Sequence, residues 1–166
     1  SGNGHKITGL WINRPEESAV GFIGEVLEGE VYQVGIQTDE KGVIGGPYTG
    51  IIAGIIRQGK ISECYTTGYV VSRQVDPISP QRYLCAGINA FGANITNSYS
   101  TAVVRNETSD GYVAGIGTYS FAESCYFAGT FESNKEATQY GITSYYSNYS
   151  YYNTETTGLS GGRTTA

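Results

Sequence analysis

Hydrophobic residues in this chain occur in short runs rich in valine and isoleucine, and glycine, asparagine or serine separates one run from the next. No stretch places apolar residues at positions i, i+3, i+4 and i+7 without an intervening glycine, so the pattern is not that of amphipathic helices. Residues 50–70, "GIIAGIIRQGKISECYTTGYV", have the pattern of a short strand, a turn and a second short strand. The chain is therefore predicted to be all-β.

The stretch 50–70 recurs along the chain. Similar segments are "LCAGINAFGANITNSYSTAVV" (84–104), "YVAGIGTYSFAESCYFAGTF" (112–131), "QYGITSYYSNYSYYNTETTG" (139–158) and, more loosely, "VGFIGEVLEGEVYQVGIQ" (20–37). Aligning the copies gives one column that is glycine throughout: Gly24, Gly54, Gly87, Gly115 and Gly141. The next column is isoleucine in the last four copies: Ile55, Ile88, Ile116 and Ile142. A repeat of about 30 residues, unequal only through insertions, is typical of a solenoid.

Further columns indicate which solenoid this is. One apolar column comprises Val31, Ile61, Ile95 and Ala122, and another comprises Val70, Val104 and Phe131. Helical repeats need two amphipathic segments in each copy, and such segments are missing. We expect a right-handed parallel β-helix of about five coils, with equivalent residues stacked about 4.8 Å apart. It should form one domain over residues 1–166, with a loop insertion at 71–83 and a start that is typical of a fragment of a longer chain.

Tyrosines gather in two places. Four of them align in one column: Tyr65, Tyr99, Tyr126 and Tyr152. A stack of these rings would fix the register of the coils, so we expect a structural ladder. The sequence leaves open whether its rings face the core or solvent. A second group lies near the C-terminal end: Tyr145, Tyr146, Tyr149 and Tyr151. Strand alternation places half of those rings outside, so they are candidates for binding a glycan or a protein, or for packing against another domain.

The charge of the chain narrows the classes of partner. The formal net charge is −5, and only 15% of residues are charged. Nucleic-acid binding depends on clustered lysine and arginine, so this class of partner is not expected. No stretch of about 18 apolar residues is present, so membrane insertion is not expected either.

Residues for catalysis or metal binding are scarce. His5 is the only histidine, and we expect it to be a structural residue of the first coil. Acid–base cleavage of a glycosidic bond needs two carboxyl groups about 5–10 Å apart. Glu63 aligns with Asn97, Ser124 and Ser150, so it has no stacked acidic partner. Neither a Cys-x-x-Cys pair nor an Asp-x-Asp-x-Asp loop occurs, so we predict no catalytic residue, metal site or cofactor.

The three cysteines are predicted to be free. Cys64 and Cys125 share a column but lie two coils apart, which corresponds to a separation of about 10 Å. A disulfide needs Cα atoms within about 7 Å, so this pair should not form one. Cys85 belongs to another column. All three are expected to be buried thiols that act as small hydrophobic residues.

The columns resemble the GLUG-motif repeats of bacterial surface and secreted proteins, whose consensus runs roughly "GGLVGxNxGxIxNSYATGxV". "GIIAGIIRQGKISECYTTGYV" and "AGINAFGANITNSYSTAVV" match that consensus closely, and "AGIGTYSFAESCYFAGTF" matches it more loosely. The opening "GNGHKITGLWI" resembles the element that often precedes such repeats, and "YYNTETTGLSGGRTT" resembles the element that closes them. The resemblance covers most of residues 2–165. The first copy departs from it at residues 32–36.

The resemblance implies an extracellular module of a bacterial adhesin-like protein at the cell surface or secreted, without catalytic activity of its own. Such a module would space or present a binding face for a host or matrix protein or a glycan, beside neighbouring domains of the same chain. One alternative is a glycan-binding module of a secreted polysaccharide-degrading protein. A β-helix polysaccharide lyase or hydrolase is less favoured, because paired carboxylates and basic residues are missing. An ice-binding solenoid lacks the regular Thr-x-Thr column it would need.

Overall fold

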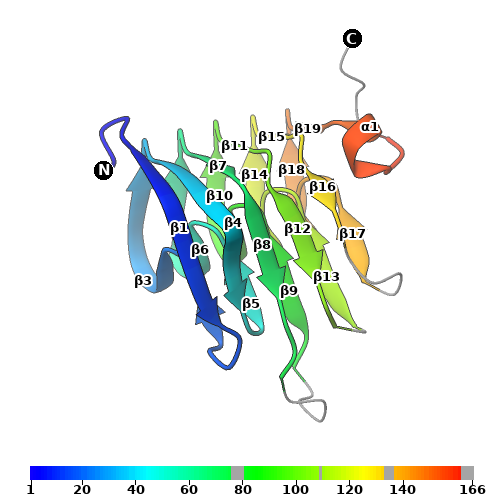
Figure 1. The fold of residues 1–166 in the computed structure, drawn as a ribbon. Helices are drawn as coiled ribbons and strands as arrows, with labels where there is room; N and C mark the ends of the chain where they lie inside the picture. The colour runs from blue at the N-terminus through cyan, green and yellow to red at the C-terminus, as the bar shows by residue number, and fades with distance from the viewer. Residues whose placement is uncertain (76–80, 109, 133–136, 162–166) are drawn as a thin grey trace.

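The fold is a parallel β-solenoid, as the sequence predicts. The computed structural model describes residues 1–75, 81–108, 110–132 and 137–161. Its strands form three parallel sheets, and two of these have five strands each. From the first to the last strand of such a sheet the chain makes about four turns. Figure 1 shows the turns stacked side by side, with the two termini at opposite ends of the stack.

Each sheet collects one strand or strand pair from every coil. Sheet A contains β1 (Lys6–Arg14), β4 (Gly35–Gly45), β7 (Tyr65–Thr67), β8 (Tyr69–Ser72), β11 (Tyr99–Ser100), β12 (Val103–Asn106), β15 (Tyr126–Phe127), β16 (Thr130–Phe131) and β19 (Tyr151–Tyr152). Sheet B contains β2 (Ala19–Val20), β5 (Tyr48–Gly50), β9 (Tyr83–Ala86), β13 (Gly111–Ala114) and β17 (Thr138–Tyr140). Sheet C contains β3 (Ile23–Tyr32), β6 (Ala53–Ser62), β10 (Asn89–Thr96), β14 (Phe121–Glu123) and β18 (Tyr146–Asn148).

One coil passes through the sheets in the order B, C, A. The second coil, for example, runs through β5, turns at Ile51 and Ile52, and continues as β6. It turns again at Glu63 and Cys64 and enters sheet A as β7 and β8. The cross-section therefore has three sides. Residues at the same place in successive coils pair with each other across the sheets.

The core consists of the inward-facing columns. The predicted apolar column is confirmed, because Ile61 pairs with Val31 on one side and Ile95 on the other, and Ile95 pairs with Ala122. The predicted column of Val70, Val104 and Phe131 is also confirmed, and Val43 extends it by one coil. The β-branched side chains that dominate these columns suit a pleated, buried surface.

The single glycine column of the sequence alignment is wrong. Gly87, Gly115 and Gly141 do stack, since their neighbours Ala86, Ala114 and Tyr140 pair in register. Gly54 instead lies within β6, level with Ala90 and with Gly24. The cause is that the tripeptide Ala-Gly-Ile begins at Ala53 in the second coil, inside a strand, but at Ala86 in the third, before the corner.

The isoleucine column is corrected in the same way. Its member in the second coil is Ile52, not Ile55. The backbone N–H of Ile52 donates to the carbonyl of Ile88 at 3.0 Å, and Ile88 donates to Ile116 at the same distance. Ile116 in turn donates to Ile142 at 3.0 Å. This corner between sheets B and C is therefore bonded from coil to coil.

Glycine is needed at the corner because the next coil approaches it closely. A Cβ atom on Gly87 would overlap the carbonyl oxygen of Gly115 and the side chain of Ser100. On Gly115 it would overlap the carbonyl oxygen of Gly141 and the ring of Phe127. Gly87 and Gly115 thus allow the backbone of one coil to lie against the next and against an inward side chain.

The opposite corner, between sheets C and A, has a left-handed backbone in every coil. Its residues are Gln33, Glu63, Asn97, Ser124 and Tyr149, all with φ between 48° and 54°. Only Asn97 among them is of a type that favours this conformation. The column shows that the stack imposes the backbone shape of this corner on whatever side chain is present.

The loop between β8 and β9 and the segment after β19 complete the fold. The predicted insertion at 71–83 is shorter, because residues 71 and 72 belong to β8 and residue 83 belongs to β9. Residues 76–80 lie outside the described residues. At the C-terminal end the short helix α1 (Thr154–Thr157) follows β19, and Asn153 caps it by accepting from the backbone N–H of Glu155 and of Thr156.

Gly115→Ala tests the close approach at the glycine corner. The added methyl group would force apart the backbone of the next coil and the ring of Phe127. We expect a loss of about 1–3 kcal/mol in the free energy of unfolding, as for overpacked cores. Gly24→Ala is the milder comparison, because its added Cβ would meet only the carbonyl oxygen of Ala19, at 3.1 Å, and not overlap it as at Gly115. Urea unfolding of both variants measures the difference, and equal losses would contradict the corrected column.

Candidate functional site

The C-terminal tyrosines predicted to bind a partner are exposed, but they lie on two faces of the solenoid. Tyr145 and Tyr146 are 63% and 57% exposed and lie at the start of β18 on sheet C. Tyr151 lies on sheet A, in β19. Tyr149, 69% exposed, lies at the corner between the two sheets. The structure therefore brings Tyr145 and Tyr146 together and places Tyr151 around the corner.

The tyrosine ladder exists, with a different last member. Tyr99 pairs with Tyr65 and with Tyr126, and Tyr126 pairs with Tyr151 rather than with Tyr152. Tyr99 and Tyr151 are exposed, so the ladder, whose direction the sequence left open, lies on the outer side of sheet A. Strand alternation explains this direction, because the residues after the ladder, such as Phe127, face the core.

Tyr152 has a separate position at the end of the core. It pairs with Phe127, and its ring lies where a Cβ on Gly141 would be. Its hydroxyl donates to the carbonyl oxygen of Ser160. Tyr152 thus covers the inward column at the last coil and is not a rung of the outer ladder.

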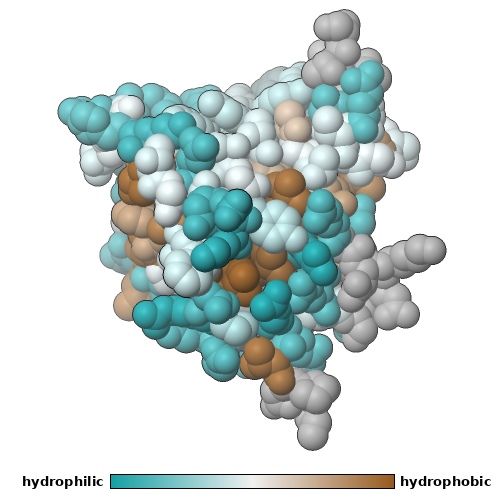
Figure 2. Space-filling model, viewed as in Figure 1, coloured by the Kyte–Doolittle hydropathy of each residue, from teal (hydrophilic) through white to brown (hydrophobic). Residues whose placement is uncertain are grey.

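Two rings of the outer ladder stack on each other. Tyr65 and Tyr99 have centroids 5.2 Å apart and ring planes within 7° of parallel. Each ring covers the facing side of the other, while Tyr99 is still 45% exposed. Figure 2, drawn from the same side as Figure 1, shows many hydrophilic residues on the visible face. The stacked pair links adjacent coils and helps to hold them in register.

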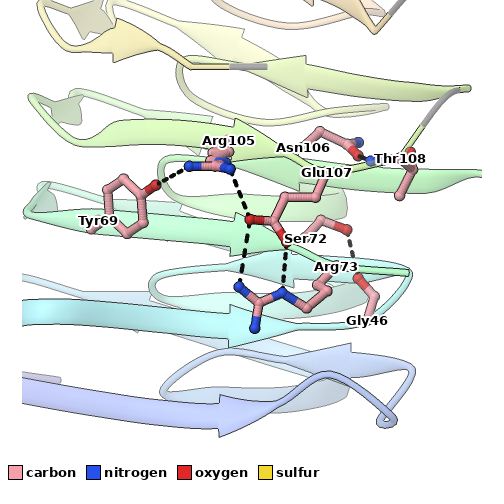
Figure 3. Close-up of polar contacts among 8 residues, drawn as sticks. All are labelled: Gly46, Tyr69, Ser72, Arg73, Arg105, Asn106, Glu107 and Thr108. Atoms are coloured by element: carbon pink, nitrogen blue, oxygen red, sulfur yellow. Dashed lines mark hydrogen bonds and ion pairs between the residues drawn. The ribbon is translucent and has the colours of Figure 1, made fainter. Parts of the chain in front are cut away.

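Beside the ladder, polar side chains of sheet A bind one another. The Nε of Arg73 lies 2.6 Å from a carboxylate oxygen of Glu107, and Nη2 of Arg105 lies 3.1 Å from the other. Arg105 also donates to the hydroxyl of Tyr69 at 3.4 Å. Figure 3 shows these residues bridging neighbouring coils. The hydrogen bond from Arg73 and the charges of both guanidinium groups lower the pKa of Glu107.

A different arrangement occurs on the outer face of sheet C. A groove of about 560 Å³ lies over β10, β14 and β18. Its residues are Lys60, Asn94, Ile95, Thr96, Phe121, Ala122, Glu123, Tyr146 and Asn148. Phe121 is 49% exposed and lies beside Tyr146, its partner on the next coil. The groove thus combines exposed rings with amide, carboxylate and ammonium groups.

Sequence reasoning missed Phe121 as a candidate binding residue. The signal was present, because Phe121 precedes Ala122 of the apolar column and so faces outward. Its ring contacts Tyr145 edge to face, with centroids 4.8 Å apart and planes at 89°, and lies 6.3 Å from Tyr146 at 56°. None of these pairs is parallel, unlike Tyr65 and Tyr99. This aromatic cluster of Phe121, Tyr145 and Tyr146 is the candidate binding surface.

The other residues considered for catalysis or metal binding do not come together in one site among the described residues. The corner column of Glu63 ends at Tyr149, not at Ser150 as predicted, and Glu63 accepts a hydrogen bond from Gln33 at 2.9 Å. His5 is exposed in the turn before β1, where its carbonyl oxygen accepts from the N–H of Gly35. Within residues 1–75, 81–108, 110–132 and 137–161, no three His, Cys, Asp or Glu side chains are grouped to hold a metal ion.

The three cysteines are buried and free, as predicted. Burial raises the pKa of Cys85 to about 12 and that of Cys125 to about 11. Burial also raises the pKa of Cys64. These thiols are protonated at neutral pH, which makes them poor nucleophiles.

A further hollow, of about 620 Å³, opens at the N-terminal end of the stack between Trp11 on β1 and Val20 on β2.

Within the described part of the chain, no helix is long and apolar enough to cross a membrane. In comparisons with known proteins, no family model, no curated protein and no solved structure matches this chain. The assignment of a function therefore depends on the geometry of the surfaces described above.

Glu107→Gln tests the ion-pair network of sheet A. Because the pKa of Glu107 is lowered in the folded state, its stabilising effect is complete above the ordinary value of 4.5 and is lost as pH falls through the lowered value. We expect the variant to be less stable than the wild type by about 0.5–1 kcal/mol at pH 7, with the difference vanishing in acid.

Chemical denaturation at a series of pH values measures this difference. Glu28→Gln is the control, because Glu28 is an exposed residue of β3 that makes no ion pair with the described residues. A constant gap between wild type and Glu107→Gln across the acidic range would contradict an ionic origin.

Proposed function

We propose that this chain is a non-enzymatic, extracellular repeat module of a bacterial adhesin-like surface protein, and that it presents a binding face. The observation that carries the proposal is the aromatic cluster of Phe121, Tyr145 and Tyr146, held outward on sheet C. Exposed aromatic side chains on a rigid surface are typical of binding sites. The resemblance to GLUG-motif repeats supports the same role and the extracellular setting.

The solenoid suits this role physically. Backbone hydrogen bonds between coils run the length of the stack, for instance from Ile52 to Ile88 and from Ile88 to Ile116. A scaffold bonded in this way holds outward side chains at fixed spacings, so little conformational entropy is lost when a partner binds. Host or matrix proteins and glycans are the proposed partners, with neighbouring domains of the same chain setting the position of the module.

The second candidate is a glycan-binding module of a secreted polysaccharide-degrading protein. The polar side chains that line the groove beside Phe121 favour it, because sugar hydroxyls need hydrogen-bond partners as well as an apolar face. In both candidates the binding surface is the same. They differ in the protein to which the module is joined, and catalysis is assigned to neither.

A binding comparison tests the proposed role. Wild type, Tyr145→Ala and Tyr149→Ala are applied to immobilised extracellular-matrix proteins, to cultured cells and to a glycan array. Loss of an exposed ring at the centre of an interface weakens binding by about tenfold, which we expect for Tyr145→Ala. Tyr149→Ala, at the corner, should have a smaller effect.

Trp11→Ala is the control, because Trp11 is 53% exposed on β1 at the other end of the stack. It should bind as the wild type does. Wild-type protein that binds none of these surfaces would overturn the binding role and leave only that of a spacer.

A further inference from the structure

We propose, on the basis of the binding role above, that the groove on sheet C is a site for a neutral oligosaccharide that lies across the strands of successive coils. Two hollows meet at Phe121 and Asn94. The first is the groove of about 560 Å³ described above. The second, of about 170 Å³, is bounded by residues that include Arg57, Gly92 and Tyr119.

The pairing of the strands sets the direction of the ligand. Asn94, Phe121 and Tyr146 pair in one row across three neighbouring strands of the groove. Neighbouring strands are about 4.8 Å apart, so this row exceeds the length of one sugar ring. The groove therefore runs across the strands, along the solenoid axis. The second hollow adjoins this row at Phe121 and contains Tyr119, two residues earlier on the same coil.

The polar groups of the groove are available for a ligand. Lys60, Asn94, Glu123 and Asn148 make no side-chain hydrogen bond or ion pair with the described residues. The side chains of Arg73, Glu107 and Arg105 on sheet A, in contrast, are bound to one another. A sugar hydroxyl both donates and accepts, so it matches a mixture of amide, ammonium and carboxylate groups.

Thr96 adds an independent observation. Its hydroxyl oxygen is buried and has no hydrogen-bond partner among the described residues, although the side chain lines the groove. A buried hydroxyl without a partner costs free energy. A ligand hydroxyl in the groove would supply the missing partner, and the cost would then be recovered on binding.

The charges of the groove favour a neutral ligand over an acidic one. Lys60 and Glu123 contribute one charge of each sign. Arg57, in the second hollow, is held by Glu25 with Nε 2.6 Å from its carboxylate. No unpaired excess of positive charge faces the groove from the residues that line the two hollows. An anionic saccharide would lack the cationic partners that it needs.

Affinity electrophoresis and calorimetry test the proposal with named probes. The neutral probes are glucan, mannan, xylan and galactan with their di- to hexasaccharides, and the acidic probes are polygalacturonate and alginate. We expect at least one neutral probe to bind, more tightly as the chain lengthens, and with little dependence on salt because no ion pair is formed. Binding confined to the acidic probes, or abolished by salt, would overturn the ligand class.

Substitutions locate the site. Phe121→Ala should weaken binding of the neutral probe about tenfold, the size expected for an aromatic contact. Thr96→Val should weaken it as well while leaving thermal stability unchanged or higher, because it removes a hydroxyl without a partner. Glu28→Gln, at an exposed residue of β3 that lines neither hollow, should bind as the wild type does.

Two further variants separate this proposal from the proposed function. Trp11→Ala and Tyr99→Ala, on other surfaces, should leave saccharide binding unchanged. Saccharide binding that is equal in wild type, Phe121→Ala and Thr96→Val would overturn the site. If matrix or cell binding is retained in that case, the binding role stands and the groove is not its saccharide site. If no saccharide binds but a matrix protein binds and Phe121→Ala weakens that binding, the ligand class is overturned in favour of a protein partner.

Discussion

The structure depends on the backbone hydrogen bonds that join each coil to the next. Because the bonding groups recur in every coil, equivalent residues must adopt the same backbone shape. The corner between sheets C and A shows this clearly: Glu63, Ser124 and Tyr149 all take a left-handed conformation that their side chains do not favour. At the other corner the same constraint brings backbones so close that Gly115 has no room for a side chain. At the first corner the stack sets the backbone shape whatever the side chain, and at the second it restricts the residue to glycine.

The outer faces of sheets A and C differ in how their side chains contact those of adjacent coils. On sheet A, outward groups bind their neighbours from adjacent coils, as Tyr65 does with Tyr99 and Arg73 with Glu107. Those contacts add side-chain links to the backbone links. On sheet C, the polar side chains of Asn94, Glu123 and Asn148 make no such contacts with the described residues, and the ring of Phe121 beside them is 49% exposed. Of the two faces, sheet C is therefore the one whose outward polar side chains remain available to a ligand.

Much of the fold could be predicted because a repeat of strands has few ways to bury its apolar columns. The column through Ile61 and Ile95 follows directly from alternation. The errors arose where short motifs recur at different places in the coil. Ala-Gly-Ile is inside a strand at Ala53 but before a corner at Ala86, and no local signal separates the two. The last coil shifted by one residue, which exchanged Tyr151 for Tyr152, because runs of tyrosine fit either register. The groove was missed because its residues come from four coils.

The buried cysteines give the molecule a built-in set of reporters. Cys64, Cys85 and Cys125 belong to three successive coils, and each is shielded from solvent in the native fold. A thiol reagent can reach them only when the coil that holds them opens. In a stack where each coil contacts only its neighbours, opening can begin at an end and spread inward. The rates at which the three sulfurs become modified would therefore record the order in which the solenoid unwinds, without any label added to the chain.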